Sequence, residues 1–346
     1  MDMIKNKPFL TDEKVDDFTA EDFVFVHRNE ELLDEAYTAT SYAKDVWMHF
    51  KKNKGAVLGA IIIIAIILLA IIGPTISGYK ADAINLDVQS LPPRIQGIYK
   101  LGIFSGYEKG VDQYAAHGVS QAFYWFGTDT NGRDLFTRVW EGTRVSLIIA
   151  LSAVVIDIVI GMSYGLISGY FGGKVDMVMQ RFMEILNGIP TLVVVTLLGL
   201  VLPPGITSIV FALMITGWIG MARISRAEVL KLKESEFILA SRTLGAKNFS
   251  IIFKEVMPNI FGQLIVMSMF SIPNAIFTEA FLSFVGLGIQ APDASLGSLI
   301  SDGYKSLTGH PHIIMSAIIV LALLMLSFNL FADGIRDAFD PNQKQR

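Results

Sequence analysis

Cysteine and charge are what this sequence most lacks. None of its 346 residues is Cys, which excludes disulfides, thiolate metal sites and a Cys nucleophile. Only 17% of the residues are charged and 52% are hydrophobic, whereas roughly a quarter of the residues of a soluble globular protein are charged. The formal net charge of −4 does not favour nucleic-acid binding. The composition therefore predicts an integral membrane protein.

Two further elements are absent. Residues 1–45 are polar and acidic, and no apolar run follows a basic start, so they are not a secretory signal peptide. We expect a solvated, partly disordered tail with one helix near residues 36–50. The chain also has no Gly-x-x-x-x-Gly-Lys-[Ser/Thr] phosphate loop, so it cannot hydrolyse ATP alone.

Six stretches are apolar enough to cross a bilayer. The first transmembrane helix is expected within residues 46–77, and its core Ile61–Leu69 contains only Ile, Leu and Ala. Lysines at positions 44, 51, 52 and 54 precede this span and place the N-terminus in the cytoplasm. The other five spans are expected at about residues 145–167, 179–202, 207–221, 260–285 and 313–331.

The loops alternate accordingly. Residues 78–140 contain no span and are expected to form an extracellular loop. Residues 141–341 then hold five helices around the loop 223–258. That loop is expected in the cytoplasm because it is rich in Arg and Lys. Residues 342–346 form a C-terminal tail, so both termini are expected in the cytoplasm.

Within the basic loop, the spacing predicts a short helix from Glu236 to Leu244. Phe237, Ala240, Ser241 and Leu244 recur at i, i+3, i+4 and i+7, while Glu236 lies off this stripe. Gly245 should end the helix, because glycine enters the left-handed conformation without a Cβ penalty. So short a helix is not stable alone in water, so its stripe docks on its own protein or on a partner.

The same residues resemble a known motif. The segment Ala240-Ser241-Arg242-Thr243-Leu244-Gly245-Ala246, followed by Met257-Pro258-Asn259, is similar to the coupling motif of binding-protein-dependent ABC importer permeases. That motif reads Glu-Ala-Ala, three residues, Gly, nine residues, then Ile-x-Leu-Pro. Gly245 and Pro258 keep its spacing, and its leading positions fall on Leu239, Ala240 and Ser241. The resemblance implies that Glu236, Phe237, Ala240, Ser241, Leu244, Gly245 and Pro258 contact an ATPase subunit.

Other signatures resemble the peptide-type branch of this family. They are Gly127-Thr128-Asp129 to Leu147, Glu279-Ala280-Phe281-Leu282-Ser283 to Gln290, and the ending from Asn329 to Pro341. In the first, Asp129, Asn131 and Gly132 predict a tight turn, and Arg133 and Asp134 are expected to pair. Together these signatures extend the resemblance over about residues 45–341, nearly everything except the acidic tail.

A few polar residues interrupt the spans. Asp157, Asn274 and Glu279 are candidates for a polar pathway, because ionisable residues in membranes are usually functional; a packing hydrogen bond is the alternative for Asp157. Gly161, Gly165 and Gly169 predict close helix packing. Gly161 to Gly165 also fits Gly-x-Ser-x-Gly, but a hydrolase built on Ser163 is rejected because no strand precedes it.

The resemblance implies an all-α membrane protein with six transmembrane helices and a cytoplasmic coupling helix, the type I fold of ABC importer permeases. The implied function is that of an oligopeptide importer permease in the cell membrane. The implied partners are a second permease, two ATPase subunits that bind ATP and Mg²⁺, and an extracellular peptide-binding lipoprotein. The chain itself is expected to bind no cofactor or metal and not to be an enzyme. Alternatives are a dipeptide or nickel importer, or an ion-driven transporter that works alone, with Asp157 and Glu279 as its relay.

Overall fold

The computed structural model describes residues 42–203 and 205–339. The expected acidic tail falls almost entirely within residues 1–41 and the C-terminal tail within 340–346, so both predictions lie outside the described residues. The chain divides into two compact units, residues 1–45 and 46–346. Of the first unit only the start of helix α2 (Tyr42–Lys52) is described. The account below concerns the second unit.

Five helical segments of this unit are long and apolar enough to span a membrane. They are α3 (Lys54–Ser77), the run of α5 (Leu135–Ile156), η5 (Asp157–Met162) and α6 (Ser163–Phe171), the pair α9 (Ile206–Thr216) and α10 (Ile219–Leu232), the run of α12 (Asn248–Ile251), η6 (Ile252–Val256) and α13 (Met257–Phe284), and α15 (His312–Phe339). Here η5 and η6 are π-helical turns within longer helices. Each expected apolar segment except the third therefore corresponds to one continuous or nearly continuous helical segment.

The third expected span is broken. Helices α7 (Gly173–Asn187) and α8 (Thr191–Leu198) meet at an angle of 74° and make a sixth span only if the bent pair is counted as one. Pro190 precedes α8 and has no backbone N–H, and a residue before proline is disfavoured in helical conformation. The break at residues 188–190 follows from this local chemistry, which the apolar pattern alone did not reveal.

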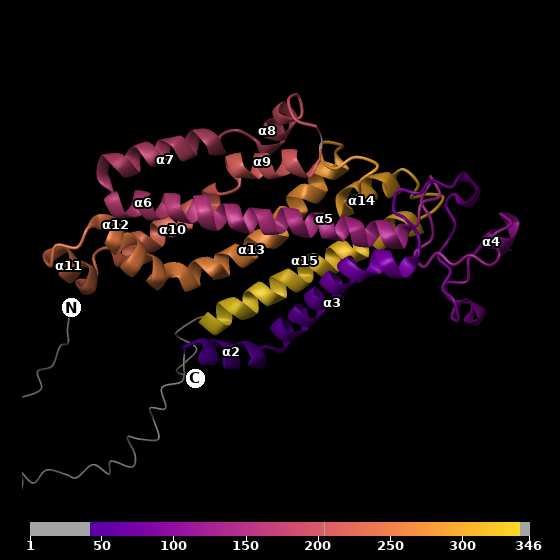
Figure 1. Ribbon diagram of the computed structural model, residues 1–346, viewed down its shortest axis with the longest axis horizontal. Helices are drawn as coiled ribbons and strands as arrows, with labels where there is room; N and C mark the ends of the chain where they lie inside the picture. Colours follow the sequence, from indigo (N-terminus) through magenta and orange to yellow (C-terminus); the bar gives the residue numbers. More distant parts are fainter. Residues whose placement is uncertain (1–41, 204, 340–346) are drawn as a thin grey trace, which may run out of the picture. The chain divides into compact units, whose positions relative to one another are not determined.

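The helices pack around the run α5–η5–α6 (Figure 1). Helix α3 contacts α5 and α15, and α13 contacts α5 and α15 as well. Helix α6 packs closely on α10, and a Cβ atom added to Gly169 would lie 2.9 Å from the carbonyl oxygen of Arg226 and from Cβ of Val229. The predicted glycine ridge is thus confirmed as the surface that lets these two helices approach.

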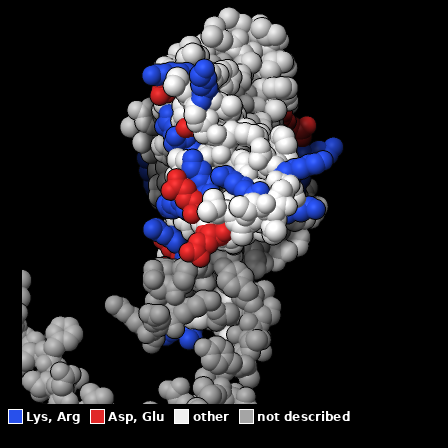
Figure 2. Space-filling model, turned by 90° about the vertical axis from the view of Figure 1, so that its left-hand side faces the viewer, with Lys and Arg blue, Asp and Glu red and all other residues white. Residues whose placement is uncertain are grey.

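The two ends of this bundle differ. One end carries α11 (Glu236–Thr243), α12 and the adjoining ends of α6, α7 and α10 (Figure 1); we call it the basic end. Its face shows many Lys and Arg side chains (Figure 2), in keeping with their excess over Asp and Glu between residues 172 and 258. The opposite end, the loop end, carries residues 79–134, residues 285–295 and α14 (Leu296–Tyr304).

The segment 79–134 is a folded unit with little regular structure. It contains η3 (Leu86–Val88), η4 (Tyr99–Leu101), a hairpin of β1 (Tyr107–Glu108) and β2 (Val111–Asp112), and α4 (Gln113–Ala116). Its small core consists of Val88, Leu91, Tyr114 and Tyr124. Burial raises the pKa of Tyr114 and Tyr124 above the ordinary value, that of Tyr124 to about 12, because the ionised phenolate loses its hydration there.

Candidate functional site

Helix α11 is held to the bundle by one face. Ile238 is fully buried and packs in a cluster of apolar side chains from α6, α10, α12, η6 and α13. The guanidinium of Arg242 lies over the ring of Tyr170 on α6, 4.9 Å from its centroid, a cation–π contact. The hydroxyl of Tyr170 in turn donates to Oδ1 of Asn248 at 3.3 Å. These contacts fix the helix against the ends of three neighbours.

The end of α11 is equally defined. The N–H of Ala246 donates to the carbonyl of Ser241 at 3.1 Å, and that of Gly245 to the carbonyl of Arg242 at 3.0 Å. This pair of bonds is the Schellman motif, with Gly245 at φ 81° in the left-handed position. The predicted helix and its glycine stop are confirmed, with Leu244 as the capping residue.

The opposite face of α11 points out of the chain. Leu244 is 88% exposed and Phe237 is 44% exposed, Ala240 is exposed and Ser241 is half-buried. The predicted stripe therefore does not dock on its own protein, because Ile238 does that instead. An exposed apolar patch on a folded helix is typical of an interaction surface.

Sequence spacing missed two residues of this surface. Leu239 on α11 and Phe249 on α12 are both more than half exposed, so each adds an exposed apolar side chain at the basic end. Leu239 occupies the first leading position of the coupling motif, so the motif, rather than the helical period, contained that signal. Glu236 lies in the first turn of α11, where the helix dipole favours a negative charge. Pro258 lies apart from these residues, in the first turn of α13.

Helices α6, α7 and α10 are joined beneath this surface by a polar network. The carboxylate of Asp176 on α7 accepts two hydrogen bonds from the Arg226 guanidinium on α10, both at 2.6 Å. It also accepts one from the hydroxyl of Ser168 on α6 at 2.6 Å. Such bidentate charge-assisted pairs are among the stronger polar contacts in proteins. The partner of Asp176 lies 50 residues away, which local spacing could not reveal.

Two of the three candidate pathway residues meet at one cavity. Asp157 and Asn274 line a cavity of about 50 Å³ together with Ser271, Thr278 and Gly217. Asp157 is 5% exposed and is the first residue of the π-helical turn η5, a feature that occurs frequently at functional sites. Polar and apolar side chains both line this cavity, which has room for water. The structure thus places a carboxylate, an amide and hydroxyls around one small polar space.

Glu279 has different surroundings. It is fully buried and accepts hydrogen bonds at 2.8 Å from the hydroxyls of Ser146 on α5 and Ser283 on α13. Ser283 also accepts from the N–H of Ile289 at 3.1 Å. Glu279 therefore ties α5, α13 and the following segment together and does not line the cavity of Asp157.

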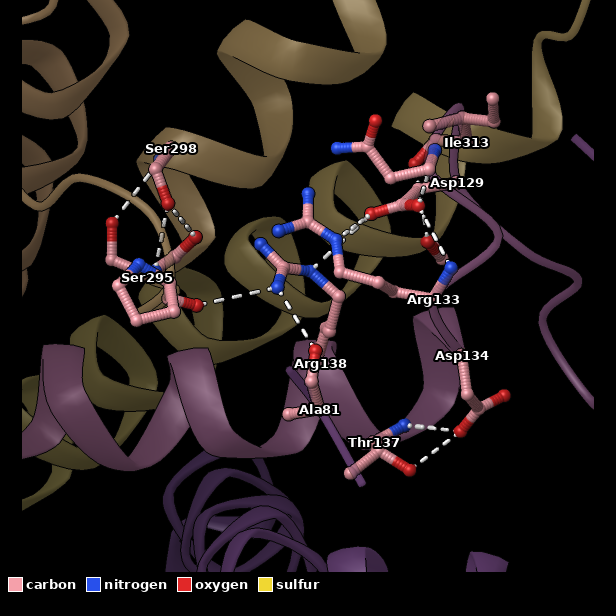
Figure 3. A network of polar contacts seen from close by, with 12 residues as sticks. Ala81, Asp129, Arg133, Asp134, Thr137, Arg138, Ser295, Ser298 and Ile313 are labelled. Carbon is pink, nitrogen blue, oxygen red and sulfur yellow. Dashed lines mark hydrogen bonds and ion pairs between the residues drawn. The ribbon is translucent and has the colours of Figure 1, made fainter. Parts of the chain in front are cut away.

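The loop end contains a clasp of buried charges (Figure 3). Asp129 accepts hydrogen bonds from Nε of Arg133 at 2.7 Å and from the backbone N–H groups of Arg133 and Asn131 at 2.9 and 2.8 Å. Nε of Arg138 lies 3.6 Å from the same carboxylate. Arg138 also donates to the carbonyls of Ala81 and Pro292. The clasp therefore ties the segment 79–134 to α5 and to the segment before α14.

One predicted contact in the clasp is wrong. Arg133 pairs with Asp129, not with Asp134. The Asp134 carboxylate turns back to cap α5 and accepts from the N–H and the hydroxyl of Thr137 at 2.9 and 2.5 Å. Burial raises the pKa of Asp134 above its ordinary value, and the bonds from Thr137 oppose that rise. The predicted tight turn is confirmed, since the N–H of Gly132 donates to the carbonyl of Asp129 at 2.9 Å.

Comparison with known proteins gives these features a family. Residues 161–345 match the binding-protein-dependent transport system inner membrane component family. Residues 41–93 match the N-terminal transmembrane domain of oligopeptide transport permease C. The chain belongs to the binding-protein-dependent transport permeases. It is therefore a multi-pass membrane component of a transport system with the type I ABC importer permease fold.

Individual relatives cover nearly the whole chain. The chain is 41% identical to the dipeptide transport system permease protein DppC of Bacillus subtilis (strain 168), over 92% of this chain and 91% of the relative. It is 42% identical to the oligopeptide transport system permease protein OppC of the same organism, over 87% and 90%. A solved structure titled as inward-facing conformations of the MetNI methionine ABC transporter aligns with 18% identity and a TM-score of 0.49, covering 59% of this chain and 97% of that one.

Proposed function

We propose that this permease is the C-type subunit of an ATP-driven importer for oligopeptides. The proposal is supported by relatives described as oligopeptide and dipeptide permeases that match 87% to 92% of the chain. The dipeptide relative makes a dipeptide importer the second candidate. The chain would form the pathway with a second permease, and an extracellular peptide-binding lipoprotein would deliver the substrate.

The observation that carries the coupling role is helix α11. Its Ile238 face and its Arg242–Tyr170 contact fix it to the bundle, while Phe237, Ala240 and Leu244 stay exposed. A docked ATPase subunit could therefore push on a helix that moves together with α6 and α10. ATP and Mg²⁺ would bind to the two ATPase subunits, and this chain would carry out no chemical step and hold no cofactor.

The polar cavity supports a role in the pathway. Asp157 and Asn274 give the spans hydrophilic groups at one place, where a passing peptide with its own amides and charged termini could exchange hydrogen bonds with water and protein. Alternation of the pathway between inward- and outward-facing states would follow from rigid-body motion driven by the ATPases.

The orientation in the membrane is part of the proposal. The basic end would face the cytoplasm because Lys and Arg are enriched in cytoplasmic loops, and the loop end would face outward. The native chain has no Cys, so single cysteines can be labelled without background. A Cys in place of Lys305 should react with an impermeant reagent in intact cells, and one in place of Lys247 should not. Labelling at position 247 alone would reverse the orientation.

The coupling role is tested by Ala240→Asp. A charge in a dry contact is costly unless it is paired, so peptide uptake should collapse. Stimulation of ATP hydrolysis by the peptide-loaded binding protein should also be lost in reconstituted membranes. Assembly with the second permease should survive, because Ala240 is exposed on the surface of α11.

Ala227→Asp is the matched control. Ala227 is also exposed, and Arg223 and Lys231 lie four residues before and after it on α10, where they can stabilise the new carboxylate. This variant should transport normally. Normal uptake and stimulated ATPase in a correctly assembled Ala240→Asp complex would show that α11 does not couple the subunits.

A further inference from the structure

Helix α3 has a backbone carbonyl that its own helix cannot satisfy. Pro74 has no N–H, so the carbonyl of Ala70, four residues earlier, loses its usual intrahelical donor. Arg144 on α5 supplies the missing hydrogen bonds: its Nε and one terminal nitrogen donate to this oxygen at 3.2 and 2.9 Å. The guanidinium is therefore fixed at the seam between α3 and α5, although its side chain remains exposed.

Two hollows meet at this arginine. The first, of about 570 Å³, is lined by the last turn of α3, the segment that follows it, the start of α5 and residues 292–294. The second, of about 500 Å³, lies along α3 and α5 and is lined by apolar side chains apart from Arg144 itself. Both volumes fall in the range of small-molecule sites in proteins. We call them the polar pocket and the apolar groove.

The polar pocket contains charges of both signs. Its charged lining residues are Lys80, Asp82, Glu141, Arg144 and Asp293. Within the described part of the chain, none of the five forms an ion pair with another side chain. A ligand that carries one positive and one negative group would satisfy both sets, whereas a simple anion or cation would satisfy one and be repelled by the other.

The groove continues from the pocket toward the middle of the membrane along both helices. Ile67, Ala70 and Ile71 precede Pro74 by three to seven residues, and Leu147, Ile148 and Leu151 follow Arg144 by the same spacing. At 1.5 Å per residue these side chains lie about 5–10 Å deeper than the pocket. Because α3 ends at Ser77, the pocket lies at the depth of the lipid headgroups and the groove at that of the acyl chains.

From this arrangement we propose that the seam between α3 and α5 is a binding site for a phospholipid whose headgroup carries a phosphate and a primary ammonium, as in phosphatidylethanolamine. Lys80 and Arg144 face the phosphate, and Asp82, Glu141 and Asp293 accept from the ammonium. One acyl chain fills the groove beside Ile148. A helix of a second permease would cover the groove equally well but would leave the five charges without partners.

Lipid binding at this site requires only that the chain is embedded in a membrane, so the proposal is independent of whether the substrate is a peptide. It is tested on the purified importer complex, in detergent, by native mass spectrometry with phosphatidylethanolamine, phosphatidylcholine or phosphatidylglycerol added at equal concentration. Phosphatidylethanolamine should be retained best, because the quaternary ammonium of phosphatidylcholine has no N–H donors and phosphatidylglycerol has no cation. Equal retention of all three, or a preference for phosphatidylglycerol, would overturn the assignment.

Variants locate the site. Glu141→Gln combined with Asp293→Asn should lower retention of phosphatidylethanolamine about tenfold, as for the loss of one charge-assisted hydrogen bond. Retention of phosphatidylglycerol should not fall, because the lost carboxylates repel an anionic headgroup. Ile148→Trp should fill the groove and lower retention of every lipid. Asp87→Asn is the matched control, since Asp87 is an exposed carboxylate at the same end that does not line the pocket. An unchanged profile in the double variant would overturn the proposal.

A photoreactive amino acid in place of Ile148 separates lipid from protein as the occupant. Irradiation of the assembled complex in membranes should give adducts of phospholipid mass. Adducts to the second permease in place of lipid would show that a protein helix fills the groove, and the lipid site would be wrong. Unfolding temperatures of all variants in detergent without added lipid should match the parent, which confirms that they fold.

Discussion

The two ends of the helical bundle reverse the usual pattern of burial in opposite ways. At the loop end, charged side chains are buried: Arg138 is 1% exposed and Asp129 is 4% exposed, and Nε of Arg138 lies 3.6 Å from the Asp129 carboxylate. At the basic end, apolar side chains are exposed on α11, with Leu244 at 88%. Buried ion pairs resist rearrangement, because separating the two partners leaves an unpaired charge away from water. Exposed apolar side chains on a fixed helix instead favour binding, because a partner that covers them removes apolar surface from water.

The charged clasp is formed within the chain, whereas α11 leaves an apolar face exposed. Within the segment 79–134, the clasp satisfies its charges internally or through the adjoining segments. Helix α11 is attached to the bundle through the buried side chain of Ile238 and the contact of Arg242 with Tyr170. Its C-terminal end is closed by backbone hydrogen bonds. Substitutions at the two ends should therefore fail in different assays.

The largest effect is expected for Asp129→Ala. This change removes the shared partner of two buried arginines, and breaking a buried ion pair costs about 3–5 kcal/mol. The variant should show a lower unfolding temperature and poor recovery of folded complex. Unfolding of the detergent-purified complex, followed by size-exclusion chromatography, measures this.

Glu184→Ala is the control for that prediction. Glu184 also pairs with an arginine, Arg181, at 2.6 Å, but both side chains are more than half exposed. Exposed pairs contribute about 0–1 kcal/mol, so the unfolding temperature should hardly change. If the two variants were equally stable, the loop end would not depend on its buried charges.

A smaller, local effect is expected for Ile238→Ala. Loss of a buried Ile side chain costs about 2–5 kcal/mol, and here the loss falls on the attachment of α11. Amide hydrogens of residues 236–246 should exchange faster, and stimulated ATPase activity should fall while the complex stays assembled.

Leu239→Ala is the matched neighbour. Leu239 is exposed, so its loss should leave amide exchange in the isolated permease unchanged and still weaken stimulation by removing apolar contact area. The same exchange rates in both variants would mean that Ile238 does not anchor the helix.

Gly245→Val tests the end of the same helix. Valine at a positive φ is strained by about 1–3 kcal/mol, so the chain leaving α11 should be redirected and stimulated ATPase activity should drop. Gly245→Asn should largely restore activity, because Asn tolerates the left-handed conformation. Equal activity of the Val and Asn variants would contradict a role for the conformation of Gly245.

The smallest effect concerns alkaline pH at the loop end. Burial raises the pKa of Tyr124 to about 12, so the folded segment holds its phenolic proton where an unfolded one has lost it. The stability that this raised pKa contributes to the folded segment is fully present below about pH 10. It is lost as the pH rises toward 12. Tyrosinate absorbance should rise together with proteolysis of residues 79–134, whereas proteolysis around α11 should not follow this titration.

Much of the architecture could be predicted from local pattern. Apolar runs such as Ile61–Leu69 are stable only when they are buried in lipid or protein. The order of basic and polar loops predicts on which side of the membrane each loop lies. The glycine stop at Gly245 and the turn at Asp129 were predictable because each depends on a few neighbouring residues. In the same way, the period of α11 identified a helix with an apolar stripe.

What the sequence by itself determined is therefore the set of apolar segments, the apolar stripe of α11 with its glycine stop, and the basic loop that contains it. The tertiary structure alone decided that Ile238 turns inward and Phe237 outward, that Arg133 pairs with Asp129, and that Asp157 shares a cavity with Asn274 while Glu279 does not. Each of these depends on which side chains a fold brings within hydrogen-bonding or packing distance. Helical periodicity places a residue on a face, but only the packed neighbours determine whether that face is buried.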